Sequence, residues 1–404
     1  MTDFIHPPLR LTLLSSSDPT AVARARELER ILDGTAAGIG WDLGTLESPP
    51  PGTEPLGEKL ELKVFTARPD GEASAWLDAT LHSVVVVLVD GALLADGPTL
   101  DWLRACAKHL DSRPGRHRLI AVPFDEGLHQ RWLALGGDLG EYQTLLWTLL
   151  DPEPAGRADQ LALRALQGMI GVLAIVVLGR PERSLRLFLS HAKLDGFYLA
   201  QSLRHFLDQQ SWLSTFYDAR DIEPGTSWKQ ALRDAVGRCL LLVLRTDLYD
   251  RRLWCRQEVR WAEAFGVPRV VVDARSGLVH PASELALESA PTVRIPDGNL
   301  ARVLFAALQT ALRSLLFQRR VMELQRLGRL PGPGSNLRVL SFPPSVETLA
   351  RACQELGEPT EAAKRLIVYP DPPLTEGLGL AAEALVRSVG ARLATPGQLA
   401  SEAV

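Results

Sequence analysis

The chain has 404 residues, which exceeds a single ordinary hydrophobic core and favours two to four domains. With 46% hydrophobic and 23% charged residues, its composition is typical of a soluble globular protein. The formal net charge of -4 argues against a broad nucleic-acid-binding or membrane-binding face, because such a face concentrates basic residues.

The cysteines and the N-terminus indicate a reducing compartment. Four cysteines are scattered without CxxC or metal-type spacing, which is typical of small core residues. Residues 1–10 lack the order of charged, apolar and small residues that marks a secretory signal. The apolar stretch 169–179 is about half as long as a bilayer span, so we expect a buried helix there and a cytoplasmic protein with no membrane partner.

The first unit, residues 1–180, is predicted to alternate strands and helices. Its strands are expected at 9–14, 60–65, 84–89 and 119–122, and its helices at 21–32, 75–81 and 158–169. Continuous apolar, β-branched runs that alternate with helices indicate parallel strands covered on both faces. This unit is therefore predicted to be an α/β domain.

The second unit, residues 184–328, repeats the same order. Its strands are expected at 185–189, 214–217, 239–244, 269–273 and 292–295, and its helices at 196–207, 228–238, around Glu258, and at 299–327. A Pro-Gly-Pro-Gly run at 331–334 ends the unit, because that composition cannot continue a helix.

The third unit, residues 335–404, is short. Strands at 337–342 and 365–369 and helices at 346–356 and 377–390 are expected. About 70 residues could barely fold alone, so we expect this unit to pack against the second. All three units begin with a short apolar strand that has an arginine near its start, which indicates three related α/β units.

Glu258 is the candidate catalytic residue. At helical spacing it shares a mostly apolar face with Trp254, Trp261 and Phe265. Its i±3 and i±4 positions carry no cation, so the common ion pair along a helix is not formed from those positions. A carboxylate in this setting is either incidental or functional.

Two loops are expected to converge near Glu258. Ser190 and His191 end the first strand of the second unit, and Pro224 and Gly225 form a turn before the next helix. The carboxyl ends of parallel strands meet at one edge of an open α/β sheet, where ligands usually bind. The sequence therefore predicts a binding site at this edge.

The second unit resembles the TIR (Toll/interleukin-1 receptor) domain, particularly its bacterial NAD-cleaving type. The similarity lies in LFLSHAKLD (187–195), DIEPGTSWKQAL (221–232) and LWCRQEV (253–259), which look like the first strand with its Ser-His loop, the BB loop, and the WCxxE signature. The resemblance implies flavodoxin-like parallel sheets flanked by helices, with a TIR domain between a TIR-like N-terminal unit and a small C-terminal α/β unit.

Enzymatic members of this family cleave the bond between nicotinamide and ribose in NAD. The resemblance places the catalytic glutamate at Glu258. It implies an NAD+ glycohydrolase, releasing linear or cyclic ADP-ribose, that acts as a bacterial antiphage effector activated by oligomerisation. NAD+ is then a substrate rather than a cofactor, and the expected partners are NAD+ and other TIR domains. A carboxylate suits this chemistry, because departure of nicotinamide leaves an oxocarbenium-like ribose.

Each candidate residue also has an ordinary structural interpretation. Trp254 is a core residue or a ring that stacks on the ligand, and Ser190 and His191 either contact the ligand or satisfy local hydrogen bonds. Asp195 is predicted to cap the next helix. The residues predicted to bind NAD+ are Ser190, His191, Lys193, Arg220, Trp228 and Trp254; of these, Lys193 and Arg220 are either solvated or neutralise the pyrophosphate.

The first unit is interpreted as a degenerate copy of the second. Alignment of Trp102 with Trp254 puts Cys106 opposite Glu258, and the Ser-His loop is missing. We therefore expect a TIR-like fold without NAD chemistry.

Two rival functions stay open. One is a non-enzymatic module for pairing with other TIR domains, and the other is a small-molecule sensor in the first or third unit. Glu258 separates the enzyme from the scaffold, since a scaffold does not need it.

Overall fold

The computed structural model describes most of the chain and divides it into two compact units. Unit 1 comprises Met1–Pro181 with Gln318–Arg320, and unit 2 comprises Glu182–Phe317 with Val321–Val404. The described residues are 8–32, 60–142, 144–179, 185–210, 213–216, 228–277, 287, 290–295, 298, 300–332, 336–356, 365–371 and 373–401. Three sheets are present in these ranges, all parallel and all flanked by helices, so the predicted α/β class is confirmed.

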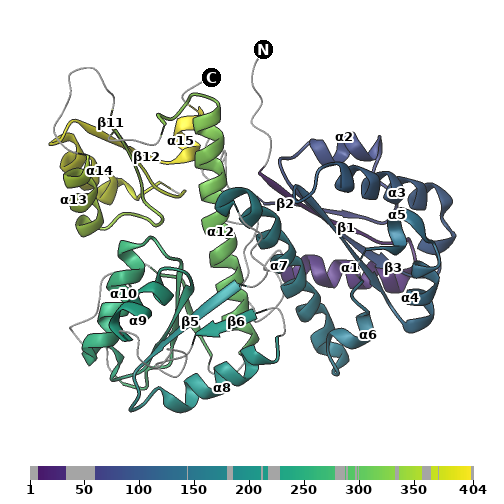
Figure 1. The fold of residues 1–404 in the computed structure, drawn as a ribbon, viewed down its shortest axis with the longest axis horizontal. Coiled ribbons are helices and arrows are strands. Elements are labelled where there is room, and N and C mark those ends of the chain that lie inside the picture. The colour runs from purple at the N-terminus through teal and green to yellow at the C-terminus, as the bar shows by residue number, and fades with distance from the viewer. Residues whose placement is uncertain are drawn as a thin grey trace. The chain divides into compact units, whose positions relative to one another are not determined.

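Unit 1 contains a four-stranded sheet in the order β2-β1-β3-β4 (Figure 1). Its strands are β1 (Leu9–Leu14), β2 (Leu60–Phe65), β3 (Ser83–Val89) and β4 (His117–Pro123). Its helices are α1 (Pro19–Leu32), α2 (Ala73–Asp78), α3 (Gly97–Ser112), α4 (Glu126–Leu133), α5 (Gly137–Gly140), α6 (Trp147–Leu150) and α7 (Arg157–Leu178), with 3-10 turns η1 (Leu93–Ala95) and η2 (Pro154–Gly156). Every residue of β1 and β3 is buried, as expected for strands covered on both faces.

The helix predicted at 158–169 and the buried helix predicted at 169–179 form one continuous helix, α7, which passes through two glycines, Gly168 and Gly171. A Cβ at these glycines would lie 3.1 Å from Ile120 Cδ1 and 3.2 Å from the Arg118 guanidinium, so the glycines let the helix approach β4 closely. Glycine here serves packing rather than helix termination.

Within the described ranges, α7 is the helix that is long and apolar enough to cross a membrane by length and composition. Of its most apolar stretch, 67% is buried inside the fold, where it packs against α1, β3 and β4. The buried helix expected at 169–179 is therefore confirmed, as part of a longer helix whose length and composition alone would also fit a membrane span.

Unit 2 contains a five-stranded sheet in the order β6-β5-β7-β8-β9. Its strands are β5 (Leu185–His191), β6 (Leu213–Phe216), β7 (Leu240–Arg245), β8 (Arg269–Asp273) and β9 (Thr292–Arg294). Its helices are α8 (Phe197–Asp208), α9 (Trp228–Val236), α10 (Leu253–Ala264) and α12 (Ala301–Arg326), with a 3-10 turn η4 (Tyr249–Arg251). This order, in which the chain winds outward on both sides of its first strand, is that of flavodoxin-like folds.

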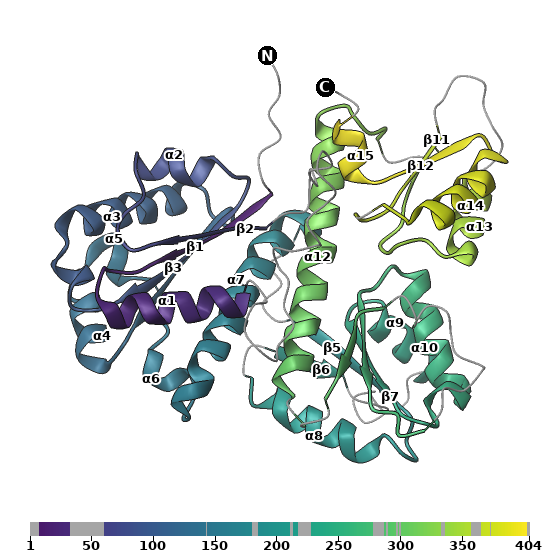
Figure 2. The same ribbon diagram turned by 180° about the vertical axis from the view of Figure 1, so that it is seen from behind.

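One face of this sheet is covered by α9 and α10, as both views show (Figures 1 and 2). A hydrophobic core joins the two helices to alternate residues of the central strands. The strands contribute Phe188 from β5, Leu241 and Val243 from β7, and Val271 from β8. Because strand side chains alternate between faces, Ser190 lies on the same face as Phe188, toward α10.

Unit 2 also contains a three-stranded sheet in the order β10-β11-β12. Its elements are β10 (Leu337–Val339), α13 (Val346–Glu355), β11 (Arg365–Val368), α14 (Glu376–Arg387), β12 (Ala391–Ala394) and α15 (Pro396–Ser401). The sequence interpretation assigned neither β12 nor α15. Strands β10 and β11 share a core with Phe317, Val321 and Leu324 of α12. The expected packing of residues 335–404 against the domain predicted at 184–328 is therefore confirmed.

The first two sheets share the strand order of their first four strands. In chain order each places its second strand at the edge, then the first, third and fourth. Cys106 lies on α3 and is completely buried in the core, where burial raises the pKa of its thiol to about 12. At this position the first unit has an inert apolar thiol in place of a carboxylate. The division into domains at residues 1–180, 184–328 and 335–404 stays a prediction.

Candidate active site

The candidate site is built on the carboxyl ends of β5 and β7. Ser190 and His191 are the last residues of β5 and pair in register with Val243 and Leu244 of β7. Since the strands are parallel, the segments that follow both of them leave from the same edge. Helix α10 follows β7 on this edge and contacts β5. The predicted convergence of the Ser190 loop and the Glu258 helix is therefore present.

A chain of hydrogen bonds joins Tyr249, Ser190 and Glu258. The Ser190 hydroxyl donates to Glu258 Oε2 at 2.5 Å, and the Tyr249 hydroxyl lies 2.6 Å from Ser190 Oγ. Ser190 carries one hydroxyl hydrogen, which it gives to the carboxylate, so Tyr249 must be the donor to Ser190. The chain is thus directional, and both hydroxyl dipoles point toward the carboxylate.

Burial fixes the protonation state of Tyr249. Its side chain is fully enclosed, and desolvation, followed by the nearby Cys255 and Glu258, raises its pKa well above 10. The phenol therefore keeps its proton at any physiological pH. Tyr249 is a permanent donor, and Ser190 is held as a donor to Glu258.

The position of Tyr249 depends on a buried ion pair. Tyr249 opens the short 3-10 turn η4, and the next residue, Asp250, accepts bonds from Arg245 Nε at 3.1 Å and Arg245 Nη2 at 2.9 Å. The side chains of Arg245 and Asp250 are 3% and 2% exposed. Arg245 is the last residue of β7, so the pair anchors the turn directly to the sheet. Removing one partner would leave a buried charge without compensation.

Asp195 holds the two loops of the site together. Its carboxylate accepts bonds from Thr246 Oγ1 and the Leu248 N–H, both at 2.9 Å. The prediction that Asp195 caps the following helix was wrong, because α8 begins after Gly196 without a side-chain cap. Asp195 instead satisfies donors of the segment after β7. It thereby joins the Ser190 loop to the segment that carries Tyr249.

Cys255 links α10 to the end of β5. Its thiol donates to the His191 carbonyl at 3.5 Å, and it lies one helical turn before Glu258. Burial, and next the Glu258 charge, raises the pKa of this thiol to about 12, so it stays protonated. His191 is half-buried, and its Nδ1 lies 3.5 Å from the Leu189 carbonyl. Cys255 is thus a packing and hydrogen-bonding residue rather than a nucleophile.

Trp254, one helical turn before Glu258, packs against a second exposed tryptophan, Trp228. Trp254 precedes Glu258 by one helical turn and is 42% exposed, and Trp228 at the start of α9 is 48% exposed. Their ring centroids are 4.4 Å apart in an edge-to-face arrangement, and Trp261 lies 6.4 Å from Trp254. Exposed rings of this size are uncommon on a helix surface unless a partner covers them. Together they offer exposed aromatic surface on which a ligand ring could pack.

The remaining predicted site residues are placed less fully. Lys193 is exposed in the turn after β5. Arg220 and the turn residues Pro224 and Gly225 lie outside the described residues. The structure therefore brings together Ser190, His191, Trp254 and Glu258 on one edge, with Trp228 against Trp254.

Sequence reasoning missed Tyr249. A signal was present, because a tyrosine between an apolar strand and a helix usually finds a hydrogen-bond partner when it is buried. The segment TDLYDRRLW (246–254) contains one such residue. The identity of its partner, Ser190, 59 residues away, could come only from the fold.

These features define a class: a flavodoxin-like α/β domain with a carboxylate held by hydroxyl donors at the carboxyl edge of its sheet. Comparison with known families makes the class specific. Residues 187–282 match the family model of the TIR domain. The chain therefore contains a TIR domain in its middle third, which supports a role in TIR-type signalling or in NAD cleavage.

Other comparisons add little. No curated protein matches the chain. Among solved structures, tagatose-6-phosphate ketose/aldose isomerase from Escherichia coli is similar at 13% identity, over 78% of this chain and 83% of that chain. The TM-score of that similarity is 0.20, too low to carry an argument about fold or function.

Proposed function

We propose that the TIR domain is an NAD+ glycohydrolase with Glu258 as its catalytic carboxylate. The observation that carries the proposal is the hydrogen bond from Ser190 to Glu258 Oε2 at 2.5 Å, on the edge of the sheet where open α/β folds bind ligands. A hydroxyl donor stabilises the ionised form of a carboxylate, so Glu258 is suited to act as a negative charge rather than as an acid.

A fixed negative charge matches the demand of the reaction. Cleavage of the bond between nicotinamide and ribose develops positive charge on the ribose as the nicotinamide leaves. A preorganised carboxylate stabilises that charge in the transition state more than it stabilises the neutral ribose of the ground state. Trp254 and Trp228 supply aromatic surface against which the adenine or nicotinamide ring can stack.

Activity is proposed to depend on assembly. NAD+ and other TIR domains are the partners, no nucleic acid or membrane is required, and the protein acts in the cytoplasm as a bacterial antiphage effector. Its product is linear or cyclic ADP-ribose, and NAD+ is consumed as substrate. These statements rest on the resemblance of the motifs at 187–195, 221–232 and 253–259 to NAD-cleaving TIR domains of the bacterial type.

The test follows nicotinamide release from NAD+ at increasing protein concentration, for the wild type and for Glu258→Ala. We expect release by the wild type that rises more steeply than linearly with concentration, and none by the variant. Glu347→Ala, which removes an exposed helix glutamate of α13, is the matched control and should behave as the wild type. Equal release by wild type and Glu258→Ala, or none by the wild type when it is forced to oligomerise, would refute the proposal.

A scaffold that pairs TIR domains is the second candidate. It is favoured by exposed apolar side chains around the site, namely Leu194 (73% exposed), Tyr198 (82%) and Leu253 (77%). Surfaces of this kind mark contacts with other proteins. A protein that self-associates but releases no nicotinamide in the same assay would support the scaffold.

A further inference from the structure

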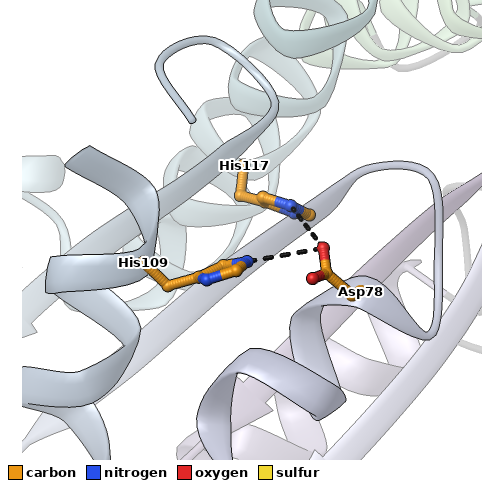
Figure 3. Close-up of side chains that lie close together, drawn as sticks. All are labelled: Asp78, His109 and His117. Carbon is orange, nitrogen blue, oxygen red and sulfur yellow. Dashed lines mark ion pairs between the residues drawn. The ribbon is translucent and has the colours of Figure 1, made fainter. Parts of the chain in front are cut away.

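Three side chains that could ligate a metal ion converge in unit 1, outside the TIR domain. Asp78 ends α2, His109 lies in the last turn of α3, and His117 opens β4 (Figure 3). His109 Nε2 lies 3.4 Å from Asp78 Oδ1, and His117 Nε2 lies 3.9 Å from the same oxygen. One ligand atom from each of the three residues falls within 4.8 Å of the others.

His117 is buried in a way that protein neighbours do not explain. Its side chain is 0% exposed, and neither ring nitrogen has a hydrogen-bond partner; His109 Nε2 has none either. A buried polar atom without a partner is costly, so such atoms usually contact water or an ion. A neutral imidazole keeps a lone pair on one ring nitrogen, and that lone pair can bind a metal ion.

The donor set and its spacing fit a transition metal. Two imidazoles and one carboxylate are a ligand set that zinc adopts in proteins, with a fourth position open to water. With metal–ligand bonds of about 2.0–2.1 Å, tetrahedral ligand atoms lie about 3.4 Å apart. The separations of 3.4 and 3.9 Å require only small side-chain adjustments to reach that geometry. Calcium and magnesium are disfavoured, because they prefer oxygen ligands.

Two arginines oppose a cation here. Arg113 Nη1 donates to Asp78 Oδ1 at 2.7 Å, and Arg116 Nη1 lies 3.4 Å from that oxygen. Arg116 is held in place by a bond from its Nε to the Leu81 carbonyl at 3.0 Å. The Arg113 side chain is 42% exposed, so it can turn into water when Asp78 binds a metal. Arg113 should therefore compete with the metal for Asp78.

We propose that Asp78, His109 and His117 form a binding site for a divalent transition metal ion, with Zn²⁺ as the best fit. The site joins the ends of α2 and α3 to the start of β4, at the amino edge of the first sheet. This edge is opposite to the carboxyl edge, where α/β sheets bind substrates, so the metal would tie α2, α3 and β4 together, with water completing its coordination. The proposal is independent of NAD chemistry.

The test uses the full chain after removal of metals with a chelator. Zn²⁺ is titrated in competition with a chromogenic chelator, and Co²⁺ is added separately to record its visible absorption, which is intense for four-coordinate sites. We expect one Zn²⁺ per chain and an intense Co²⁺ spectrum. Absence of stoichiometric binding at micromolar Zn²⁺ would overturn the proposal.

Three variants assign the binding to this site. His109→Gln should weaken Zn²⁺ binding by at least the roughly 10- to 100-fold that loss of an outer-shell partner costs. His205→Gln, which removes an exposed histidine of α8, is the control and should leave binding unchanged. Arg113→Gln keeps all three ligands and removes the competing charge, so it should tighten binding by about tenfold.

The Arg113→Gln variant keeps the test decisive if His109→Gln misfolds. If Asp78, His109 and His117 bind no metal, loss of Arg113 should not raise the affinity of the protein for Zn²⁺. Unchanged binding in His109→Gln, or weaker binding in Arg113→Gln, would also overturn the proposal.

Discussion

Substitution of Ser190 by alanine tests the hydrogen-bond chain. The change removes the donor to Glu258 Oε2 and leaves the buried Tyr249 hydroxyl without its acceptor. A hydrogen bond to a charged group contributes about 1.5–3 kcal/mol, which corresponds to about a 10- to 150-fold loss of kcat if the bond is strongest in the transition state. The unsatisfied phenol should lower the free energy of unfolding by about 1–3 kcal/mol.

Tyr249→Phe separates the two contributions. Ser190 keeps its bond to Glu258 but no longer accepts a hydrogen bond from the Tyr249 hydroxyl. A neutral hydrogen bond contributes about 1 kcal/mol, so kcat should fall by only about fivefold. In the double variant Ser190→Ala/Tyr249→Phe neither hydroxyl remains. The unfolding free energy should therefore recover relative to Ser190→Ala alone, and the effects on kcat should be less than additive.

The assay combines nicotinamide release at saturating NAD+ with urea unfolding of all four proteins. Ser388→Ala, which removes a hydroxyl that bonds the Leu385 carbonyl at the exposed end of α14, is the control for loss of a serine. A larger kcat effect from Tyr249→Phe than from Ser190→Ala, or strictly additive effects, would refute the directional chain from Tyr249 through Ser190 to Glu258.

Further predictions concern the degenerate copy, the exposed aromatic surface and acid stability. Cys106→Glu should restore no activity in a chain that carries Glu258→Ala, and it should destabilise unit 1 by several kcal/mol because it buries a carboxylate in an apolar core, as read from thermal unfolding. Trp254→Ala should raise KM for NAD+ more than it lowers kcat, whereas an unchanged KM would mean that this ring does not touch the substrate. Arg275 donates to both oxygens of Asp273, at 2.7 and 2.9 Å, and holds the pKa of that carboxyl below 3.8. The ionised Asp273 carboxylate contributes its full stability above the pKa that it has in the unfolded chain. This contribution is lost as the pH falls through its lower pKa in the folded protein. Asp273→Asn should therefore flatten the pH dependence of the free energy of unfolding between about pH 5 and 2.

Much of the fold was accessible from sequence because its strands are continuous apolar runs. The predicted bounds of β8, Arg269–Asp273, agree with the structure residue for residue. Where the pattern was ambiguous, prediction failed. The helix expected at 158–169 runs on to Leu178, because Gly168 and Gly171 let it pack closely against β4. The strand β12 carries the exposed Arg392 between buried neighbours and spans four residues, too short for its alternation to be recognised.

The candidate site could be predicted from the sequence only in part, for a different reason. Parallel topology alone brings Ser190 and Glu258 to one edge, because both follow from the ends of β5 and β7. The further bond from Tyr249 to Ser190 depends on the position of η4, which the buried Arg245–Asp250 pair anchors to β7. Asp195 likewise bonds the segment after β7 instead of its own helix. Hydrogen bonds between loops that are distant in the sequence leave no local sequence pattern, so they could not be predicted.

The central claim is that the negative charge of Glu258 is needed for chemistry. Glu258→Gln changes that charge while keeping the size of the side chain and an oxygen that can accept the Ser190 bond. The decisive measurement is the rate of nicotinamide release by oligomerised Glu258→Gln at saturating NAD+, beside the wild type at equal concentration. We predict a loss of at least about a hundredfold with unchanged thermal stability. A rate within a few-fold of the wild type would contradict the account.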